Sequence, residues 1–163
     1  RGDTAAEARI GTIGGGLDFP TGRFDVVICL NVLEHIADDT AALGQIARWL
    51  RPGGKLLLQV PAHPALFGAV DRALGHFRRY TRRDLSALLR RSGFQLTLEP
   101  TYLFLLAIPG WWWCGRVRKL SVVPQSTALV ANAVASVSRA LERVVRLPLG
   151  LTLVTVARTQ AEA

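Results

Sequence analysis

A carboxylate and an imidazole lie next to each other just beyond a short apolar segment of this sequence. Residues 24–30, FDVVICL, are apolar and rich in β-branched side chains, which is typical of a buried parallel strand covered on both faces. Asn31, Glu34 and His35 follow at once. Because open α/β sheets bind ligands beyond the carboxyl ends of their strands, this turn is the first candidate for a functional site.

The chemistry available at this turn is proton transfer. Histidine is the side-chain type that ordinarily titrates near neutrality, so His35 could act as a general base on an acceptor group, with Glu34 beside it as a second catalytic candidate. The alternative is structural, since both side chains could cap or orient the turn through hydrogen bonds. The residues alone leave both roles open.

A second polar group follows a glycine further along the chain. It contains His76, Arg78, Arg79 and Tyr80. Paired guanidinium groups can bind an anionic or phosphate-bearing molecule, so His76, Arg79 and Tyr80 are candidate substrate-binding residues. The alternative is a network that stabilises the loop, in which Asp71 pairs with Arg79 or His76.

The elements that must position these groups form a strand–helix–strand unit. Asp38 and Asp39 suit the amino end of a helix, and Pro52-Gly53-Gly54 is expected to end it. A second buried strand is predicted at 55–60. His63 lies between two prolines just after that strand and would face the rim of the same site, although a lone histidine there is more often structural. The expected helix has apolar residues at helical spacing: Ala42, Leu43, Ile46, Ala47 and Leu50.

The second half of the sequence predicts a helix, a strand, an insert and a last strand. Thr81 is the expected cap of a helix that ends near Gly93, and a strand is predicted at 94–101. The insert, 101–147, begins with the apolar and aromatic run YLFLLAIPGWWW and continues into an amphipathic helix at 127–147. The last strand is predicted at 151–157.

Several segments of the chain resemble class I S-adenosylmethionine-dependent methyltransferases, in the broad small-molecule group called methyltransferase type 11 or type 12. The resemblance implies a partial Rossmann-like α/β fold, with a mostly parallel sheet, flanking helices and a helical insert before a last antiparallel strand. It implies S-adenosylmethionine as cofactor, with its methionine end at the backbone of Leu30 and Asn31. The segments are FDVVICLNVLEHI (24–36), ARWLRPGGKLLLQVPA (47–62), GHFRRYTRRDLSALLRRSGF (75–94) and, more weakly, LPLGLTLVTVAR (147–158).

The glycine-rich cofactor loop of that family is not visible in this sequence. Gly11–Gly16 is followed by turn residues and not by a helix, so it does not fit such a loop. We expect it to connect a strand at 8–13 with the strand at 24–30. The resemblance implies an adenine contact in this connection, at Gly16 and Leu17, although the nearest acidic residue, Asp18, lies a few positions late.

The start of the chain and its composition suggest part of a longer enzyme. It begins with Arg1 and contains no methionine, so we expect residues 1–163 to be a single truncated methyltransferase domain, the C-terminal part of the enzyme. Half of its residues are hydrophobic, which is typical of a globular chain. The expected function is methyl transfer to a small-molecule or lipid-linked acceptor. The alternative is a non-catalytic fragment, or a membrane-surface or partner-binding module that no longer binds the cofactor.

Charge and cysteine content limit the expected partners. The net charge is +8, but the arginines are scattered over predicted helix surfaces and no nucleic-acid-binding motif accompanies them, so no nucleic acid is expected. The two cysteines have no zinc-binding spacing, so the sequence predicts neither a metal site nor a disulfide. A reducing, cytoplasmic compartment fits best.

The aromatic insert has three alternative roles. Trp111, Trp112 and Trp113, with cationic residues close behind, suit the surface of a membrane. They suit equally a lid over a bulky acceptor, or plain packing against the core. The apolar run of about twelve residues is too short to span a bilayer, which takes about 20.

Overall fold

The protein contains one mixed sheet in which the last strand runs against its neighbours. The computed structural model describes residues 9–119, 133–134, 136–138 and 148–160. Within these residues four strands lie in the order β1-β2-β4-β3. β1 and β2 are parallel, and β4 is antiparallel to both β2 and β3. This confirms the predicted α/β fold with a last antiparallel strand. The strands are β1 (Phe24–Leu30), β2 (Leu50–Pro61), β3 (Phe94–Leu103) and β4 (Thr152–Thr159).

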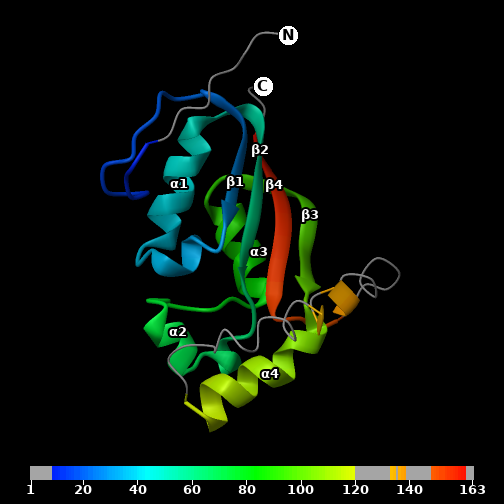
Figure 1. Ribbon diagram of the computed structural model, residues 1–163. Helices are drawn as coiled ribbons and strands as arrows, with labels where there is room; N and C mark the ends of the chain where they lie inside the picture. Colours follow the sequence, from blue (N-terminus) through cyan, green and yellow to red (C-terminus); the bar gives the residue numbers. More distant parts are fainter. Residues whose placement is uncertain (1–8, 120–132, 135, 139–147, 161–163) are drawn as a thin grey trace.

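The helices divide into two sets by their position on the sheet. Figure 1 shows α1 (Asp39–Trp49) and α3 (Arg82–Arg91) lying alongside the strands. The shorter α2 (Ala69–Ala73) and α4 (Ile108–Trp112) lie beyond the end of the sheet at which β1 and β2 terminate. Short helical turns occur at Leu33–His35, Pro64–Leu66 and Leu105–Ala107, and a π-helical turn at Trp113–Val117.

Two helix starts follow the caps that the sequence predicts. The Asp38 side chain accepts a hydrogen bond from the amide of Ala41, and the Thr81 side chain accepts one from the amide of Asp84. Each cap satisfies an amide that the first helical turn leaves without an intrahelical partner. The buried faces of α1 and α3 meet the sheet in one core that includes Leu43, Ile46, Leu56, Leu58, Leu85, Leu89 and Leu153.

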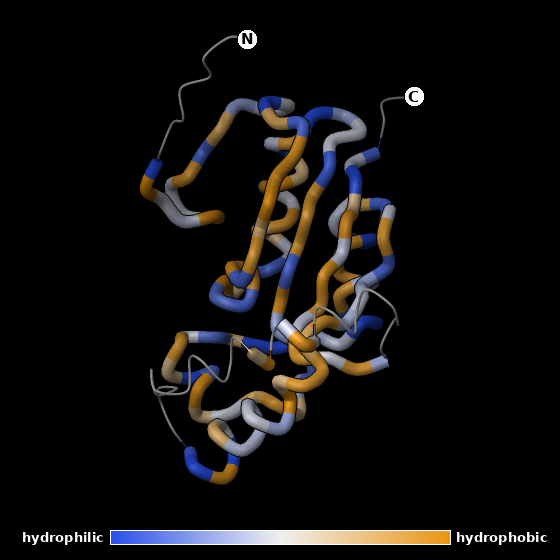
Figure 2. Tube along the Cα trace, turned by 45° about the vertical axis from the view of Figure 1, so that its right-hand side comes forward, coloured by the Kyte–Doolittle hydropathy of each residue, from blue (hydrophilic) through white to orange (hydrophobic). Residues whose placement is uncertain are grey.

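The prediction that residues 24–30 are covered on both faces is wrong. Among the described residues β1 forms one edge of the sheet, and Figure 2 shows its hydrophobic trace at that edge. Val26, Ile28 and Leu30 are exposed, Ile28 by 63%, whereas Cys29 is buried. Successive side chains point to opposite faces of a strand, so an apolar run shows that both faces are apolar but not that both are covered.

Some predicted element boundaries also differ from the structure. Residues 9–13 of the strand predicted at 8–13 form a loop and a turn; residue 8 is outside the described part. α1 ends at Trp49, before Pro52-Gly53-Gly54, because Leu50 already pairs with Phe24 as the start of β2. The glycines therefore lie within the bounds of β2. Most of the helix predicted at 127–147 lies outside the described residues, but residues 133–134 and 136–138 are helical.

Candidate functional site at the end of the parallel strands

The turn after β1 has an unusual backbone. Asn31 has φ 53°, in the left-handed region that asparagine tolerates better than most residues. Its amide donates to the Gln59 carbonyl of β2 at 3.0 Å, and the Gln59 side-chain amide donates to Asn31 Oδ1 at 3.4 Å. The short helical turn that follows buries Glu34 and leaves His35 exposed.

The second polar group is tied by backbone hydrogen bonds to the ends of both parallel strands. The amide of Phe77 donates to the Glu34 carbonyl at 2.8 Å, and the amide of Tyr80 donates to the Pro61 carbonyl at 3.0 Å. These bonds place the His76 ring against the His35 ring, edge to face, with 4.6 Å between the ring centroids. The two groups that the sequence separates are therefore neighbours in the fold.

A fully buried carboxylate holds this loop together. Asp71 Oδ1 accepts from Arg79 Nε at 2.8 Å and contacts His76 Nδ1 at 2.9 Å. Asp71 Oδ2 accepts from the amide of Gly68 at 2.9 Å. The sequence suggested that Asp71 pairs with Arg79 or His76, and the structure shows both pairings at once, as the loop-network alternative describes.

Arg79 is buried and already partnered. Besides Asp71, its guanidinium donates to the Ala62 carbonyl at 3.0 Å and lies 4.7 Å from the centre of the Trp111 ring. Burial lowers the pKa of the guanidinium below its usual value, and the Asp71 carboxylate opposes that change. The cation therefore joins the loop of residues 76–80 to the aromatic insert, and its predicted contact with an acceptor stays a prediction.

A cavity of about 330 Å³ lies where these segments meet. It contains most of the chemistry-bearing candidates, at the carboxyl ends of β1 and β2, where the fold favours ligand binding. The predicted residues Leu30, Gly16, Leu17, His63 and Tyr80 are not among those that line it. The lining residues are Asn31, Glu34, His35, Pro61, Leu74, His76, Arg79, Trp111, Leu151 and Thr152.

The carboxyl group of Glu34 is buried with one oxygen unpaired. The residue is only 1% exposed, and its Oε2 atom has no hydrogen-bond partner. Burial raises the pKa of Glu34, while its own backbone amide and the charges of His76, His35 and Arg79 oppose the increase. Burial, together with the charge of Glu34, also raises the pKa of the Cys29 thiol to about 11. A buried acid beside two imidazoles can hold or exchange a proton.

Tyr80 and His63 lie behind the cavity wall. The Tyr80 hydroxyl donates to Asp39 Oδ2 at 3.1 Å, and burial raises its pKa, with the charge of Asp39 adding to the increase. The His63 ring stacks on the Tyr102 ring, 4.9 Å between centroids, and burial lowers its pKa. His63 Nε2 is buried without a partner. The predicted substrate contacts of both residues stay predictions.

The predicted adenine contact at Gly16 and Leu17 lies in a turn that is bonded to α1 and does not line this cavity. The Gln45 side chain of α1 accepts from the amide of Gly14 at 2.6 Å and donates to the Leu17 carbonyl at 2.8 Å. This pair of bonds fixes the turn that contains Gly16. Their role in cofactor binding stays a prediction.

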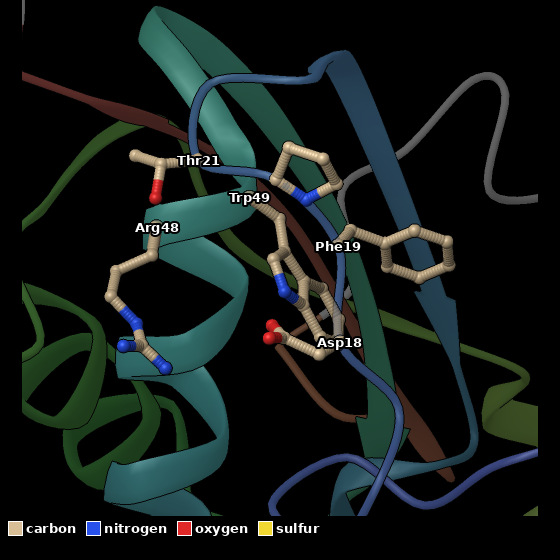
Figure 3. Close-up of a pocket in the computed structure, with 6 residues that line it drawn as sticks. Asp18, Phe19, Thr21, Arg48 and Trp49 are labelled. Atoms are coloured by element: carbon tan, nitrogen blue, oxygen red, sulfur yellow. The ribbon is translucent and has the colours of Figure 1, made fainter.

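A second cavity, of about 380 Å³, opens at the amino end of β1. Figure 3 shows Arg48 and Trp49 of α1 facing the segment Asp18–Thr21 across it. The Phe19 ring packs edge to face on Trp49 at 5.2 Å. Because ligands of α/β sheets lie at the opposite ends of the strands, this cavity is the weaker candidate.

The sequence reasoning did not single out the wall that β4 contributes. Leu151 and Thr152 line the first cavity because Thr152 pairs with Pro61, so the antiparallel β4 begins where β2 ends. The expected antiparallel direction of the last strand could have predicted this wall. An antiparallel strand begins at the carboxyl ends of the parallel strands, so its first residues lie at the site. Leu74 carried no comparable signal.

Comparisons with known proteins agree with this architecture. A family model described as a methyltransferase domain matches residues 5–99, more than half of the chain. A ubiquinone biosynthesis O-methyltransferase of Xanthomonas oryzae pv. oryzae is 39% identical over 89 residues, which are 47% of this chain and 37% of the relative. A candidate S-adenosylmethionine-dependent methyltransferase of Mycolicibacterium smegmatis is 32% identical over 82 residues, 49% of this chain and 32% of the relative. The matches thus span about a third of the length of these curated relatives.

Solved structures show the same fold at low sequence identity. A candidate methyltransferase of Bacillus halodurans superimposes with a TM-score of 0.56 at 19% identity, covering 93% of this chain and 76% of that one. A candidate methyltransferase of Haloferax volcanii was solved with the methyltransferase activator Trm112. It superimposes with a TM-score of 0.56 at 17% identity, covering 94% of this chain and 60% of that one. With the family match over residues 5–99, the chain belongs to the methyltransferase domain family.

Proposed function

We propose that this chain takes part in methyl transfer from S-adenosylmethionine to a small-molecule or lipid-linked acceptor. The observation that carries the proposal is the cavity at the ends of β1 and β2, which brings Asn31, Glu34 and His35 together in a member of the methyltransferase family. For methyl transfer from a sulfonium, the protein mainly has to align the cofactor with the acceptor and exclude water. A partly enclosed cavity lined by both apolar and polar residues suits that task.

The strand-end turn is the proposed contact for the methionine end of the cofactor. The Asn31 amide is bonded to Gln59, so the carbonyl oxygens of Leu30 and Asn31 and the Asn31 side chain are the groups that we propose to receive the ammonium. The left-handed backbone at Asn31 sets their direction. This arrangement would place the transferable methyl group in the cavity beside His35.

His35 is the proposed general base for an acceptor hydroxyl. It is exposed and lines the cavity, and a histidine side chain is the usual general base of enzymes. The Xanthomonas relative is named as an O-methyltransferase, and oxygen acceptors are those that benefit from such a base. Glu34 and His76 lie beside His35, and Arg79 and Trp111 line the same cavity.

We expect the turn at Asn31 to control cofactor affinity through its backbone. Asn31→Val should weaken binding of S-adenosylhomocysteine about tenfold, because a β-branched residue disfavours the left-handed conformation by about 1–2 kcal/mol. Asn31→Gly, which permits that conformation, should stay within about threefold of the parent. Calorimetric titration with S-adenosylhomocysteine measures the affinities of the parent and of both variants. It is done in this chain and in the longest natural protein that contains it.

The same titration decides the proposed function. Saturable binding by either parent protein supports it, and binding by neither overturns it. Equal affinities for Asn31→Val and the parent, with both proteins folded by circular dichroism, would show that the cofactor does not depend on this turn.

We also propose that the aromatic insert contacts an anionic membrane surface, which would suit a lipid-linked acceptor. Trp112 and Trp113 are about half exposed, and Leu106 and Val117 are exposed near them, beside the exposed Arg116. Amphipathic rings flanked by cations suit the interfacial region of a bilayer. Trp111 faces the cavity instead. In the described part of the chain no helix is long and apolar enough to cross a membrane.

Replacing both Trp112 and Trp113 by serine should reduce co-sedimentation with vesicles containing anionic lipid by about tenfold or more. The reason is that most of the apolar area that would be buried in the membrane is lost. Ile10→Ser, which removes a fully exposed apolar residue outside the aromatic insert, is the matched control and should bind like the parent. Undiminished binding by the double variant would refute the membrane contact without touching the proposed methyl transfer.

A further inference from the structure

We propose that Glu34, His35 and His76 form a binding site for a divalent metal ion of the zinc type. One ligand atom from each residue lies within 4.8 Å of those of the other two, so a small movement of the side chains would bring all three to a common ion. The spacing of these residues along the sequence predicts no metal site. The backbone bond from Phe77 to Glu34 creates the cluster by joining the two loops.

The carboxylate of this cluster has an oxygen available. Glu34 Oε2 is buried without a hydrogen-bond partner, in a residue that is 1% exposed and that lines the cavity. A buried polar atom without a partner costs stability. Coordination to a cation would satisfy this oxygen, and a carboxylate oxygen is a normal zinc ligand.

His76 is oriented in the way that metal-binding histidines usually are. Its Nδ1 contacts Asp71 Oδ1 at 2.9 Å, so Nε2 is the ring nitrogen that would bind the ion. Metal-bound imidazoles commonly donate their other N–H to a carboxylate, which fixes the ring and raises its basicity. Asp71 is itself held by the Gly68 amide and by Arg79, so the ring has a rigid support.

His35 completes the set on the open side. It is exposed and packs edge to face on the His76 ring. Three protein ligands with one side open to a cavity is the arrangement of zinc sites that keep a position for a small molecule. Two imidazoles and one carboxylate favour zinc, cobalt or a similar first-row ion over magnesium or calcium, which prefer oxygen ligands.

The inference does not depend on the proposed methyl transfer. A ring nitrogen of His35 cannot bind a cation and accept a proton at the same moment, so metal binding and the base role of that nitrogen exclude each other. The test therefore reads metal binding alone, with neither cofactor nor acceptor present, and its failure would leave the proposed function standing.

The experiment is a titration of the chelator-treated protein with Co²⁺, followed by visible absorption, and with Zn²⁺, followed by calorimetry. We expect one saturable ion per chain and the intense visible bands of cobalt in a low-coordinate site. His76→Ala and Glu34→Gln should each weaken binding about tenfold or more, since even outer-shell changes cost 10–100-fold. His63→Ala is the matched control, because it removes the remaining histidine of the chain without touching the cluster.

Folding of every variant is checked by thermal unfolding in chelator. Absence of saturable binding in the parent would overturn the site. So would equal affinity for the parent and the folded variants His76→Ala and Glu34→Gln, or a loss as large in His63→Ala, because either result would place the ion elsewhere. His35→Ala provides a further folded test, since that side chain is exposed and its removal should not disturb the core.

Discussion

Replacing Asp71 with asparagine is expected to lower the free energy of unfolding by about 3–5 kcal/mol. Asp71 is fully buried and partners Arg79, His76 and the Gly68 amide. The variant keeps the shape of the side chain but removes its charge, so the buried guanidinium of Arg79 loses its counter-ion. Removing one partner of a buried ion pair lowers the stability by far more than the intact pair contributes, because the remaining charge stays buried without a counter-ion.

Chemical denaturation of the parent and of Asp71→Asn measures this loss. The matched control is Glu99→Gln, which removes the partner of Arg90 in an ion pair whose two side chains are mostly exposed. Exposed pairs of this kind contribute less than about 1 kcal/mol. A loss as small for Asp71→Asn as for Glu99→Gln would contradict the role given to the buried network.

A double variant separates lost charge pairing from lost packing. Asp71→Asn combined with Arg79→Met removes both charges, and we expect it to cost clearly less than the sum of the two single changes. The Ala62 carbonyl would lose its bond from Arg79, so some cost remains. Strict additivity would show that the two side chains stabilise the loop independently.

Local signals in the sequence predicted most of the elements. The bounds of β1 agree with the apolar run at 24–30, and the caps Asp38 and Thr81 follow from their side-chain chemistry. These features depend on neighbours within a few positions. The exposure of β1 does not, because it is set by which strands and helices lie against it.

The candidate site was predictable in its parts but not in its assembly. Asn31, Glu34 and His35 follow from the rule that ligands bind beyond strand ends. The neighbouring position of His76 depends on the hydrogen bond from Phe77 to Glu34, a tertiary contact between distant segments that no local pattern encodes. The positions of the three tryptophans also depend on tertiary structure. Trp111 lines the cavity, whereas Trp112 and Trp113 are exposed.

Replacing Gly150 with alanine is expected to cost about 3 kcal/mol or more. A Cβ atom at this position would overlap the backbone of Leu103, at 2.7 Å from its amide nitrogen and 2.8 Å from its carbonyl carbon. Leu103 is the last residue of β3 and pairs with Thr152 at the start of β4. Because Leu103 is held in the sheet by its pairing with Thr152 and Gly150 lies two residues before β4, relief requires the backbone leading into β4 to move away from β3. Overpacking of well-packed regions already costs about 1–3 kcal/mol when only side chains must move.

Gly44→Ala in α1 is the matched control, since a Cβ there meets no atom within 4 Å. It should raise the free energy of unfolding by about 0.5–1 kcal/mol, because alanine favours the helix. Denaturant titration of the two variants should therefore give shifts of opposite sign. An unchanged stability for Gly150→Ala would mean that the segment leading into β4 approaches β3 less closely than the structure shows. The cavity wall at Leu151 and Thr152 depends on that approach, so the candidate site would then have to be redrawn on that side.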